Sequence, residues 1–253
     1  MNNKLIKAAI IGGSIILTAM ILGSAFKKRN ENLDTISVIG LGTKDFVSDE
    51  ILWSGSFTTK SFDIKEAYNK MIADQKIVER FFLGKGFKKG EFSFGAVQFN
   101  KRFREVRIET GDSDYGTKYE QVFDGYEASQ TITFSAKKNP NLMKRIEDVS
   151  SKTSELINSG IELSSNSIQY TYSDLPSLKH SLIQKASKDA KERAEKIVTS
   201  ADGDLGKLKS ASMGVFQITG QGSTEEDSYG GNFDTYSKNK SARITVRLEY
   251  ELE

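Results

Sequence analysis

The sequence predicts an α+β fold, made of duplicated strand–helix–strand units whose antiparallel sheets are packed by helices, behind an N-terminal transmembrane helix. Three observations lead to this prediction: a charge-free apolar run near the start, hydrophobic periods that alternate between strand-like and helix-like, and a strand–helix–glycine–strand order that occurs twice. We expect residues 1–29 to form a membrane segment, 30–34 a polar tether, and 35–253 one domain of two halves, about 35–125 and 126–253.

The apolar run extends from Ala8 to Phe26 and contains no charged residue. As a helix it would be about 29 Å long, close to the thickness of the hydrocarbon core of a bilayer. Its length, and the three basic residues that follow it, favour an uncleaved membrane anchor; a cleaved secretory signal and a buried helix of a soluble protein are the alternatives. The basic residues on its two flanks are nearly balanced, so they leave the orientation open. The expected anchor side chains are those of Ala8, Ile10, Ile11, Ile15, Ile16, Leu17, Met20, Ile21, Leu22 and Phe26.

The composition excludes several classes of protein. All 34 acidic residues and 34 of the 36 basic residues follow Phe26, so the formal charge of that region is zero. A nucleic-acid-binding protein would be expected to carry a basic surplus, so we expect no nucleic-acid partner. The absence of cysteine excludes disulfides, thiolate metal sites and a lipid-modified cysteine. With only two prolines and modest glycine, the chain is not expected to be disordered.

In the first half, the hydrophobic period changes from two to about 3.6 and back, which is typical of strands on either side of a helix. The expected elements, in order, are strands at 35–46 and 50–61, a helix opened by Asp63 and closed at Gly84 to Gly86, a long strand or hairpin at 91–108, and a strand region ending at Lys137.

The second half repeats this order and then extends it. The expected elements are a strand at 130–137, a helix from Pro140 to Ile157 closed by Gly160, a strand at 168–172, a long helix capped by Asp174 or Ser177, a strand at 207–219, and a closing strand at 242–250. In the long helix, Leu178, Leu182, Ala186, Ala190 and Ala194 recur every four residues, and such small side chains let a helix approach a sheet or another helix closely. The polar loop from Gly220 to Asn239 is long enough to be functional or mobile.

Five short segments stand in a recognisable order: Ile36 to Gly42, Gly125 to Ser129, Ala186 to Ala194, Leu205 to Lys207, and Ile244 to Tyr250. Together they resemble the SIMPL domain family of bacterial periplasmic and outer-membrane-associated immunogenic proteins, over about residues 35–253. The resemblance implies a duplicated α+β fold, an exported location, and assembly of some members into rings or channel-like oligomers. It implies no catalytic residues, and a role in envelope integrity or stress tolerance is the usual proposal. The chain departs from the family where Pro-Asp often follows the glycines, because it has Ser48-Asp49 there, and its loop from Gly220 to Asn239 is distinctive.

Several motifs resemble known sites only in part. His180 is the only histidine, and without an obvious partner we expect a surface or capping residue rather than a general base. Gly40-Leu41-Gly42 lacks the third glycine and the following helix of a dinucleotide site, so we expect a kinked strand. Gly84 to Gly90 follows a helix, whereas a phosphate-binding loop precedes one.

Three charged motifs also fall short of a defined site. Asp112-Ser113-Asp114 lacks the remaining ligands of a calcium loop and is expected to be a turn, and Glu225-Glu226-Asp227 is expected to be a solvated cluster. Lys101-Arg102-Phe103-Arg104 should divide its side chains between the two faces of a strand, with anionic lipid or a partner protein as the alternative to solvent. We therefore expect no catalytic residue, no cofactor and no metal.

These observations favour a non-enzymatic cell-envelope protein that acts by self-association or partner binding. We expect it to be anchored in the inner membrane of a bacterium with its domain in the periplasm, or exported if the apolar segment is cleaved. The expected partners are the membrane, through residues 8–26, further copies of the chain, and an envelope protein. One alternative is an extracytoplasmic hydrolase, which would hold His180 beside a carboxylate or a serine in a deep pocket. The other is a small-ligand or lipid-binding protein, which would have an apolar cavity between helices and sheet.

Overall fold

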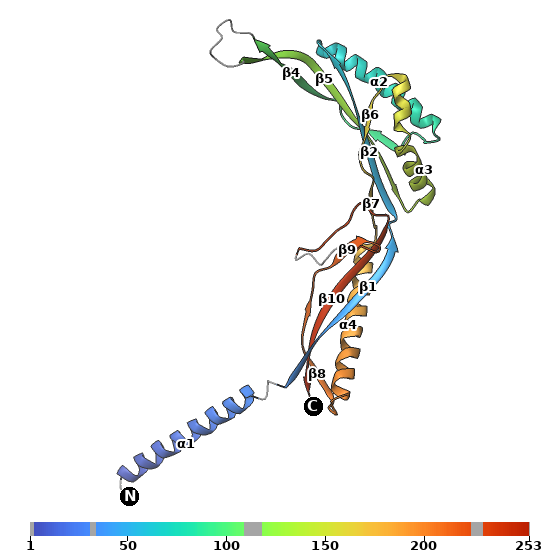
Figure 1. The fold of residues 1–253 in the computed structure, drawn as a ribbon. Coiled ribbons are helices and arrows are strands. Elements are labelled where there is room, and N and C mark those ends of the chain that lie inside the picture. Colours follow the sequence, from blue (N-terminus) through green and yellow to red (C-terminus); the bar gives the residue numbers. More distant parts are fainter. Residues whose placement is uncertain (1–2, 31–33, 109–117, 224–229, 253) are drawn as a thin grey trace.

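The fold consists of two antiparallel sheets placed end to end, with helix α1 (Asn3–Asn30) apart from both (Figure 1). The expected mixture of helices with antiparallel sheets is confirmed. The expected transmembrane helix is not found: among the residues whose side chains are described, no helix is both long enough and apolar enough to cross a membrane. The computed structural model describes residues 3–30, 34–108, 118–223 and 230–252, and the side chains of all of these except 3–10, 27–30 and 118.

The first sheet, called sheet A, joins the beginning of the domain to its end. Its central strand β10 (Asn239–Leu252) pairs with β1 (Thr35–Val47) on one side and with β8 (Leu205–Met213) and β9 (Gln217–Gly220) on the other. Helix α4 (Leu175–Thr199) packs along one face of this sheet. Because apolar and polar residues alternate along β10, its apolar side chains form the floor beneath the helix.

Helix α4 lies close to the sheet because small side chains face it. Ala186, Ala190 and Ala194 have no exposed surface, and they belong to the same buried cluster as β10. Gly40 and Gly42 of β1 lie directly against the helix backbone. The alanine stripe therefore packs against a sheet, which is one of the two partners expected for it.

The second sheet, called sheet B, is built on the pairing of β2 with β5 from Glu50 opposite Lys137 to Ser61 opposite Tyr126. Strands β3 and β4 pair with the outer side of β5, and β6 and β7 with the outer side of β2. Helices cover one face (Figure 1). The elements are β2 (Glu50–Ser61), α2 (Ile64–Gly84), β3 (Phe92–Phe94), β4 (Gln98–Ile108), β5 (Lys118–Lys137), α3 (Pro140–Ser150), the 3₁₀ helix η1 (Thr153–Ser159), β6 (Leu163–Ser165) and β7 (Gln169–Thr171).

Aromatic side chains fill the core of sheet B. The Phe134 ring lies 5.1 Å from that of Trp53 and 4.7 Å from that of Phe82, centroid to centroid. The indole nitrogen of Trp53 donates to Ser165 Oγ at 3.0 Å, so its one polar atom is satisfied. The cluster joins β2, α2 and β5, which holds the helix layer on the sheet.

The two sheets meet at Ser48-Asp49, where β1 continues into β2. The Asp49 carboxylate accepts hydrogen bonds from the backbone nitrogen and the hydroxyl of Ser173, at 2.7 and 2.6 Å. The Asp49 carbonyl accepts from the Lys138 nitrogen at 2.7 Å, and the Ser48 nitrogen donates to the Lys238 carbonyl at 2.9 Å. This junction is thus tied both to the start of α4 and to the end of β5.

The described part of the loop between Gly220 and Asn239 also reaches the junction. Ile218 of β9 exchanges backbone hydrogen bonds with Asn232 and Asp234, at 2.7 and 2.9 Å. Lys238 Nζ then lies 2.8 Å from Glu147 Oε1 on α3. This part of the loop is therefore attached to both sheets.

Three expected elements are interrupted. The expected helix from Pro140 to Ile157 ends at Ser150, where the hydroxyls of Ser150 and Ser151 bond to carbonyls of the preceding turn and compete with the helix. The expected strand from Lys207 to Thr219 breaks at Gly214, whose nitrogen bonds to the Thr245 carbonyl outside the regular ladder. The expected long strand or hairpin at 91–108 is divided into β3 and β4, which both pair with β5. The other expected elements are present to within a few residues, while β6 was not expected.

The order of pairing in space differs from the order along the chain. The expected boundary between residues 125 and 126 lies within β5, and β1 of the first half pairs with β10 of the second. Each sheet therefore takes strands from both halves.

Candidate interaction surfaces

A two-stranded ribbon extends from sheet B. Strand β2 ends at Ser61, opposite Tyr126, but β4 and β5 remain paired as far as Ile108 opposite Lys118. Beyond Tyr126 the ribbon has only two strands, and nearly all of β4 is exposed (Figure 1). An isolated pair of strands is at best marginally stable in water, so side chains on this ribbon must supply its cohesion.

Four aromatic side chains form an exposed cluster at the base of the ribbon, called the ribbon aromatic cluster. The Phe123 ring lies 5.9 Å from that of Phe103, 5.2 Å from that of Tyr126 and 6.4 Å from that of Phe62, between centroids. Phe62 is 71% exposed and Phe103 is 54% exposed. The contact between Phe103 and Phe123 joins the two strands, while much of the surface of the cluster stays in water.

Ion pairs border the cluster. Asp124 contacts Lys60, and Arg104 Nε lies 3.9 Å from the same carboxylate. The hydrogen bond from Lys60, with the charges of Arg104 and Arg102, holds the pKa of Asp124 below its ordinary value. Arg102 Nε also lies 3.5 Å from Glu127. Two of the four basic residues of β4, Arg102 and Arg104, are therefore engaged with carboxylates at the base of the ribbon.

The motif Lys101-Arg102-Phe103-Arg104 divides between two faces, as expected. Phe103 lies opposite Phe123 and Arg104 opposite Val122, and adjacent residues of a strand point to opposite faces. A register shift lies between Lys101 and Phe103. The motif thus contributes its aromatic residue to the cluster and its arginines to the ion pairs.

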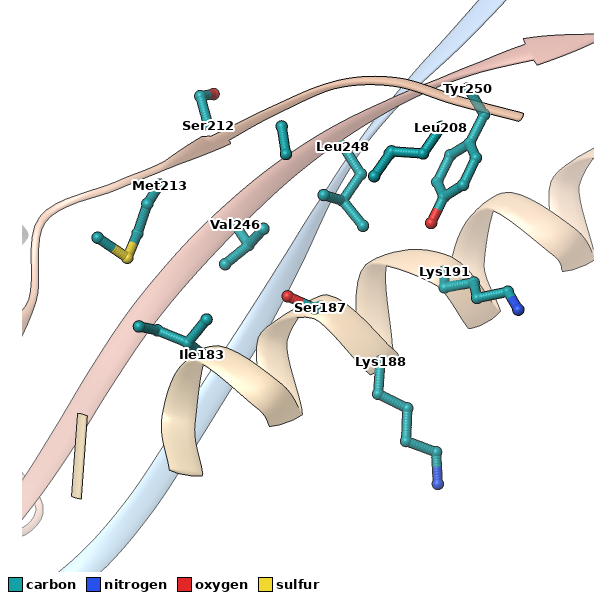
Figure 2. Close-up of a pocket in the computed structure, with 11 residues that line it drawn as sticks. Ile183, Ser187, Lys188, Lys191, Leu208, Ser212, Met213, Val246, Leu248 and Tyr250 are labelled. Carbon is teal, nitrogen blue, oxygen red and sulfur yellow. The ribbon is translucent and has the colours of Figure 1, made fainter. Parts of the chain in front are cut away.

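A groove of about 560 Å³ lies between α4 and β8 on sheet A, and we call it the α4–β8 groove (Figure 2). Helix α4 packs mainly over β1 and β10, which leaves the inner face of β8 uncovered. The groove is lined by Ile183, Ser187, Lys188, Lys191, Leu208, Ala211, Ser212, Met213, Val246, Leu248 and Tyr250. Most of these side chains are apolar, and the groove is open to solvent, whereas the small-ligand alternative predicts a cavity between helices and sheet.

A smaller hollow, of about 320 Å³, lies near the junction of the sheets. It is lined by Ser54, Asn166, Gln169 and Tyr236, together with Leu52 and Ser167. The lining is mainly polar, unlike that of the groove.

Helix α1 carries large apolar side chains on all of its sides. Ile11, Ile16 and Met20 are 60% to 69% exposed, and the other expected anchor residues between 11 and 26 that are large and apolar have similar values. At 100° per residue these positions are distributed around the whole helix. The helix contains the remaining expected anchor residues, Ala8 and Ile10, whose side chains lie outside the described set.

The structure separates the other candidate residues from one another. His180 is exposed on α4, and no described carboxylate or serine forms a hydrogen bond with it. Gly40-Leu41-Gly42 lies in β1 beneath α4, and Gly84 ends α2. Among the residues that the structure describes, no group of three His, Asp or Glu side chains could hold a metal ion. Asp112 to Asp114 and Glu225 to Asp227 lie outside the described residues.

The groove could not be located from the sequence. The alternation in β10 predicts a half-buried strand, but the sequence pattern around it does not show which of the neighbouring strands α4 covers. In β8 a register shift brings Leu208 opposite Tyr250 and Ala211 opposite Leu248, which conceals the alternation that would mark an inner face.

The segments that carry the family resemblance converge in sheet A. Ile36 to Gly42 lies in β1, Ala186 to Ala194 in α4, and Ile244 to Tyr250 in β10, and these three elements share one buried cluster. The model of the SIMPL family, described as a protein of unknown function (DUF541), matches residues 36–249. Comparison with curated proteins found no match. The family model covers most of the chain and both sheets, and the chain therefore belongs to the SIMPL family.

Proposed function

We propose that this protein is a non-enzymatic cell-envelope protein that acts by self-association or by binding a partner protein through the ribbon aromatic cluster. The exposure of these clustered rings carries the proposal, because a contiguous exposed apolar patch usually marks an interaction site. Aromatic residues are also enriched in the buried centres of protein interfaces. A partner that covers the cluster would in addition stabilise the two-stranded ribbon.

The proposal includes attachment to the inner membrane of a bacterium through α1. Its support is the uncharged run from Ala8 to Phe26, bounded by basic residues, and the apolar side chains on every side of the helix. The domain would then lie in the periplasm, or be exported if the segment is cleaved. Envelope integrity and stress tolerance are the roles that the family resemblance suggests.

An extracytoplasmic hydrolase is the rival class. It would be favoured by His180 beside a carboxylate or a serine hydroxyl, and the described residues do not provide that arrangement. The ribbon aromatic cluster, by contrast, is present and exposed, and it favours protein binding over hydrolysis.

Sedimentation of the detergent-solubilised full chain tests self-association. We expect Phe103→Ser to raise the dissociation constant about tenfold, as loss of an interface anchor does. Ile197→Ser is the matched control, because Ile197 has the same exposed fraction, 54%, but lies on α4. A wild-type chain that stays monomeric at high concentration contradicts self-association, and a photocrosslinker placed at position 103 in cells then tests for another partner.

Topology is tested separately. Protease digestion of intact and permeabilised cells, followed by N-terminal sequencing of the mature chain, shows on which side the domain lies and whether residues 1–29 are retained. Protection of the domain in cells whose outer membrane alone is opened would contradict a periplasmic location.

A further inference from the structure

We propose that the α4–β8 groove binds the acyl chain of a single-chain anionic amphiphile taken from the membrane, with the lysines of α4 holding its headgroup. The inference goes beyond the proposed protein-binding role of the ribbon, but it rests on the proposed attachment of α1 to a membrane. Four observations carry it: the lining, the charge at the rim, the size, and the place of the groove in the fold.

The lining suits an alkyl chain. Val246 and Leu248 form a floor with little exposed surface, while Leu208 and Met213 on β8 are each 52% exposed and stand uncovered beside them (Figure 2). Burying these side chains against an alkyl chain removes apolar surface of both from water, which is favourable.

The rim carries charge of one sign. Among the described residues that line the groove, only Lys188 and Lys191 are charged, and their long side chains extend from α4 at its outer edge, away from the strands (Figure 2). Each has an exposed intrahelical partner, Glu192 at 3.7 Å and Glu195 at 3.5 Å, and such solvated pairs contribute little energy. A carboxylate headgroup above the groove can therefore replace Glu192 and Glu195 as the partner of the two lysines, at a small cost in free energy.

The size of the groove is compatible with a single alkyl chain. A volume of about 560 Å³ lies within the range of small-molecule sites, about 300–1,000 Å³. One side of the groove is the body of α4, its floor is made by β8 and β10, and it is open to solvent elsewhere.

The groove also lies at the membrane-proximal end of sheet A. Tyr250, which lines it, pairs with Ile36 at the beginning of β1. Helix α1 ends at Asn30 and β1 begins at Thr35, five residues later. A fully extended chain of that length spans at most about 18 Å, so the helix and the sheet can be no further apart than this. An amphiphile at the surface of a membrane that holds α1 would be within reach of the groove.

The test uses the full chain in phosphatidylcholine nanodiscs that contain hexadecanoic acid with a photoreactive diazirine in its chain. After irradiation, we expect the β8 peptide containing Leu208 and Met213 to be labelled. Ala211→Trp, which fills the groove, should abolish this labelling. Lys188→Gln with Lys191→Gln should reduce labelling by the acid about fivefold and leave labelling by the corresponding uncharged hexadecanol unchanged.

The matched control is Lys185→Gln, an exposed lysine of α4 that does not line the groove. Labelling of β8 that is insensitive to Ala211→Trp would overturn the inference, as would equal loss of acid labelling in Lys185→Gln. Because the chain has no cysteine, Met213→Cys offers one more arm: efficient disulfide dimers would show a second copy in the groove instead of a lipid. A chain that fails to remain in the nanodiscs contradicts the anchoring proposal, whereas an anchored chain without β8 labelling contradicts only this inference.

Discussion

Gly40 of β1 lies beneath the carbonyl of Ala186 in α4, so closely that a Cβ atom placed on Gly40 would stand 2.1 Å from that oxygen. It would also stand 2.4 Å from the Ala190 nitrogen. Both obstructing atoms belong to the helix backbone, which cannot move aside as the end of a side chain can. The glycine therefore allows α4 to approach the sheet.

Gly40→Ala should lower the free energy of unfolding by about 3 kcal/mol, because the added methyl group must push α4 away from β1. Urea denaturation followed by helical circular dichroism measures this loss. Gly84→Ala is the control, because a Cβ atom added to Gly84 would have no other atom within 4 Å and the residue ends α2. We expect that variant to be neutral or stabilised by up to about 1 kcal/mol. Equal effects of the two changes would show that the contact with Ala186 does not matter.

Asp189 should make the attachment of α4 sensitive to acid. Its carboxylate accepts from the Leu41 nitrogen and from Arg193 Nε, each at 2.9 Å, and these contacts, the Leu41 bond first, lower the pKa of Asp189. Its stabilising contribution is therefore complete above the ordinary aspartate pKa of about 3.9 and is lost as the pH falls through the lower folded value.

Asp189→Asn should lower the free energy of unfolding by about 1 kcal/mol at pH 7. Below pH 4, where the wild-type carboxylate takes up a proton, the difference in this free energy between the variant and the wild type should shrink. Urea denaturation across this range measures it. Glu192→Gln is the control, since Glu192 makes only the loose contact with Lys188 at 3.7 Å. A constant difference between Asp189→Asn and the wild type at all pH values would rule out titration of this carboxylate as the cause.

Asp49→Ala should weaken the junction between the sheets. The change removes both hydrogen bonds to Ser173 and should lower the free energy of unfolding by about 1–3 kcal/mol. Hydrogen exchange gives a specific readout, because the Ser173 amide should exchange faster while the amides around Trp53 keep their protection. Asp45→Ala, which removes one exposed contact to Gln221 at 3.2 Å, should leave the Ser173 amide unchanged. Unchanged exchange in Asp49→Ala would contradict the role of Asp49 at the junction.

Tyr170 should be a late-titrating tyrosine. Burial, followed by the hydrogen bond from its hydroxyl to Glu147 at 3.0 Å and the charge of that carboxylate, raises the pKa of Tyr170 to about 12. Its contribution to stability is therefore present below the ordinary tyrosine pKa of about 10 and is lost as the pH rises from about 10 to 12. Ultraviolet titration should show one tyrosine ionising last.

Tyr170→Phe should remove that last step and flatten the alkaline decline in stability. Tyr236→Phe, which changes an exposed tyrosine, should keep the last ionisation step and the alkaline decline in stability. If the late step persists in Tyr170→Phe, another of the nine tyrosines is responsible and the assignment fails.

Features set by neighbouring residues could be predicted from the sequence. Asp63 and Asp174 cap α2 and α4 as expected, and each accepts from a backbone nitrogen three residues later. The alternation of β10 correctly marks a half-buried strand. Within the candidate surfaces, the sequence pointed to Lys101 to Arg104 but not to the cluster that Phe103 forms with Phe62, Phe123 and Tyr126. Those rings come from separate elements, and only the pairing of β4 with β5 and the end of β2 bring them together.

By itself, the sequence determined the class of fold, the positions of most helices and strands, and membership of the SIMPL family, because periodicity, caps and short segments are local properties of the chain. The tertiary structure decided which strands share a sheet, why Gly40 and Gly42 stand where they do, and that α4 leaves β8 uncovered. The pairing of β1 with β10 joins residues about two hundred positions apart, and no local pattern specifies such a contact. The ribbon aromatic cluster and the α4–β8 groove both arise where a layer of packing ends, and that boundary exists only once the chain is folded.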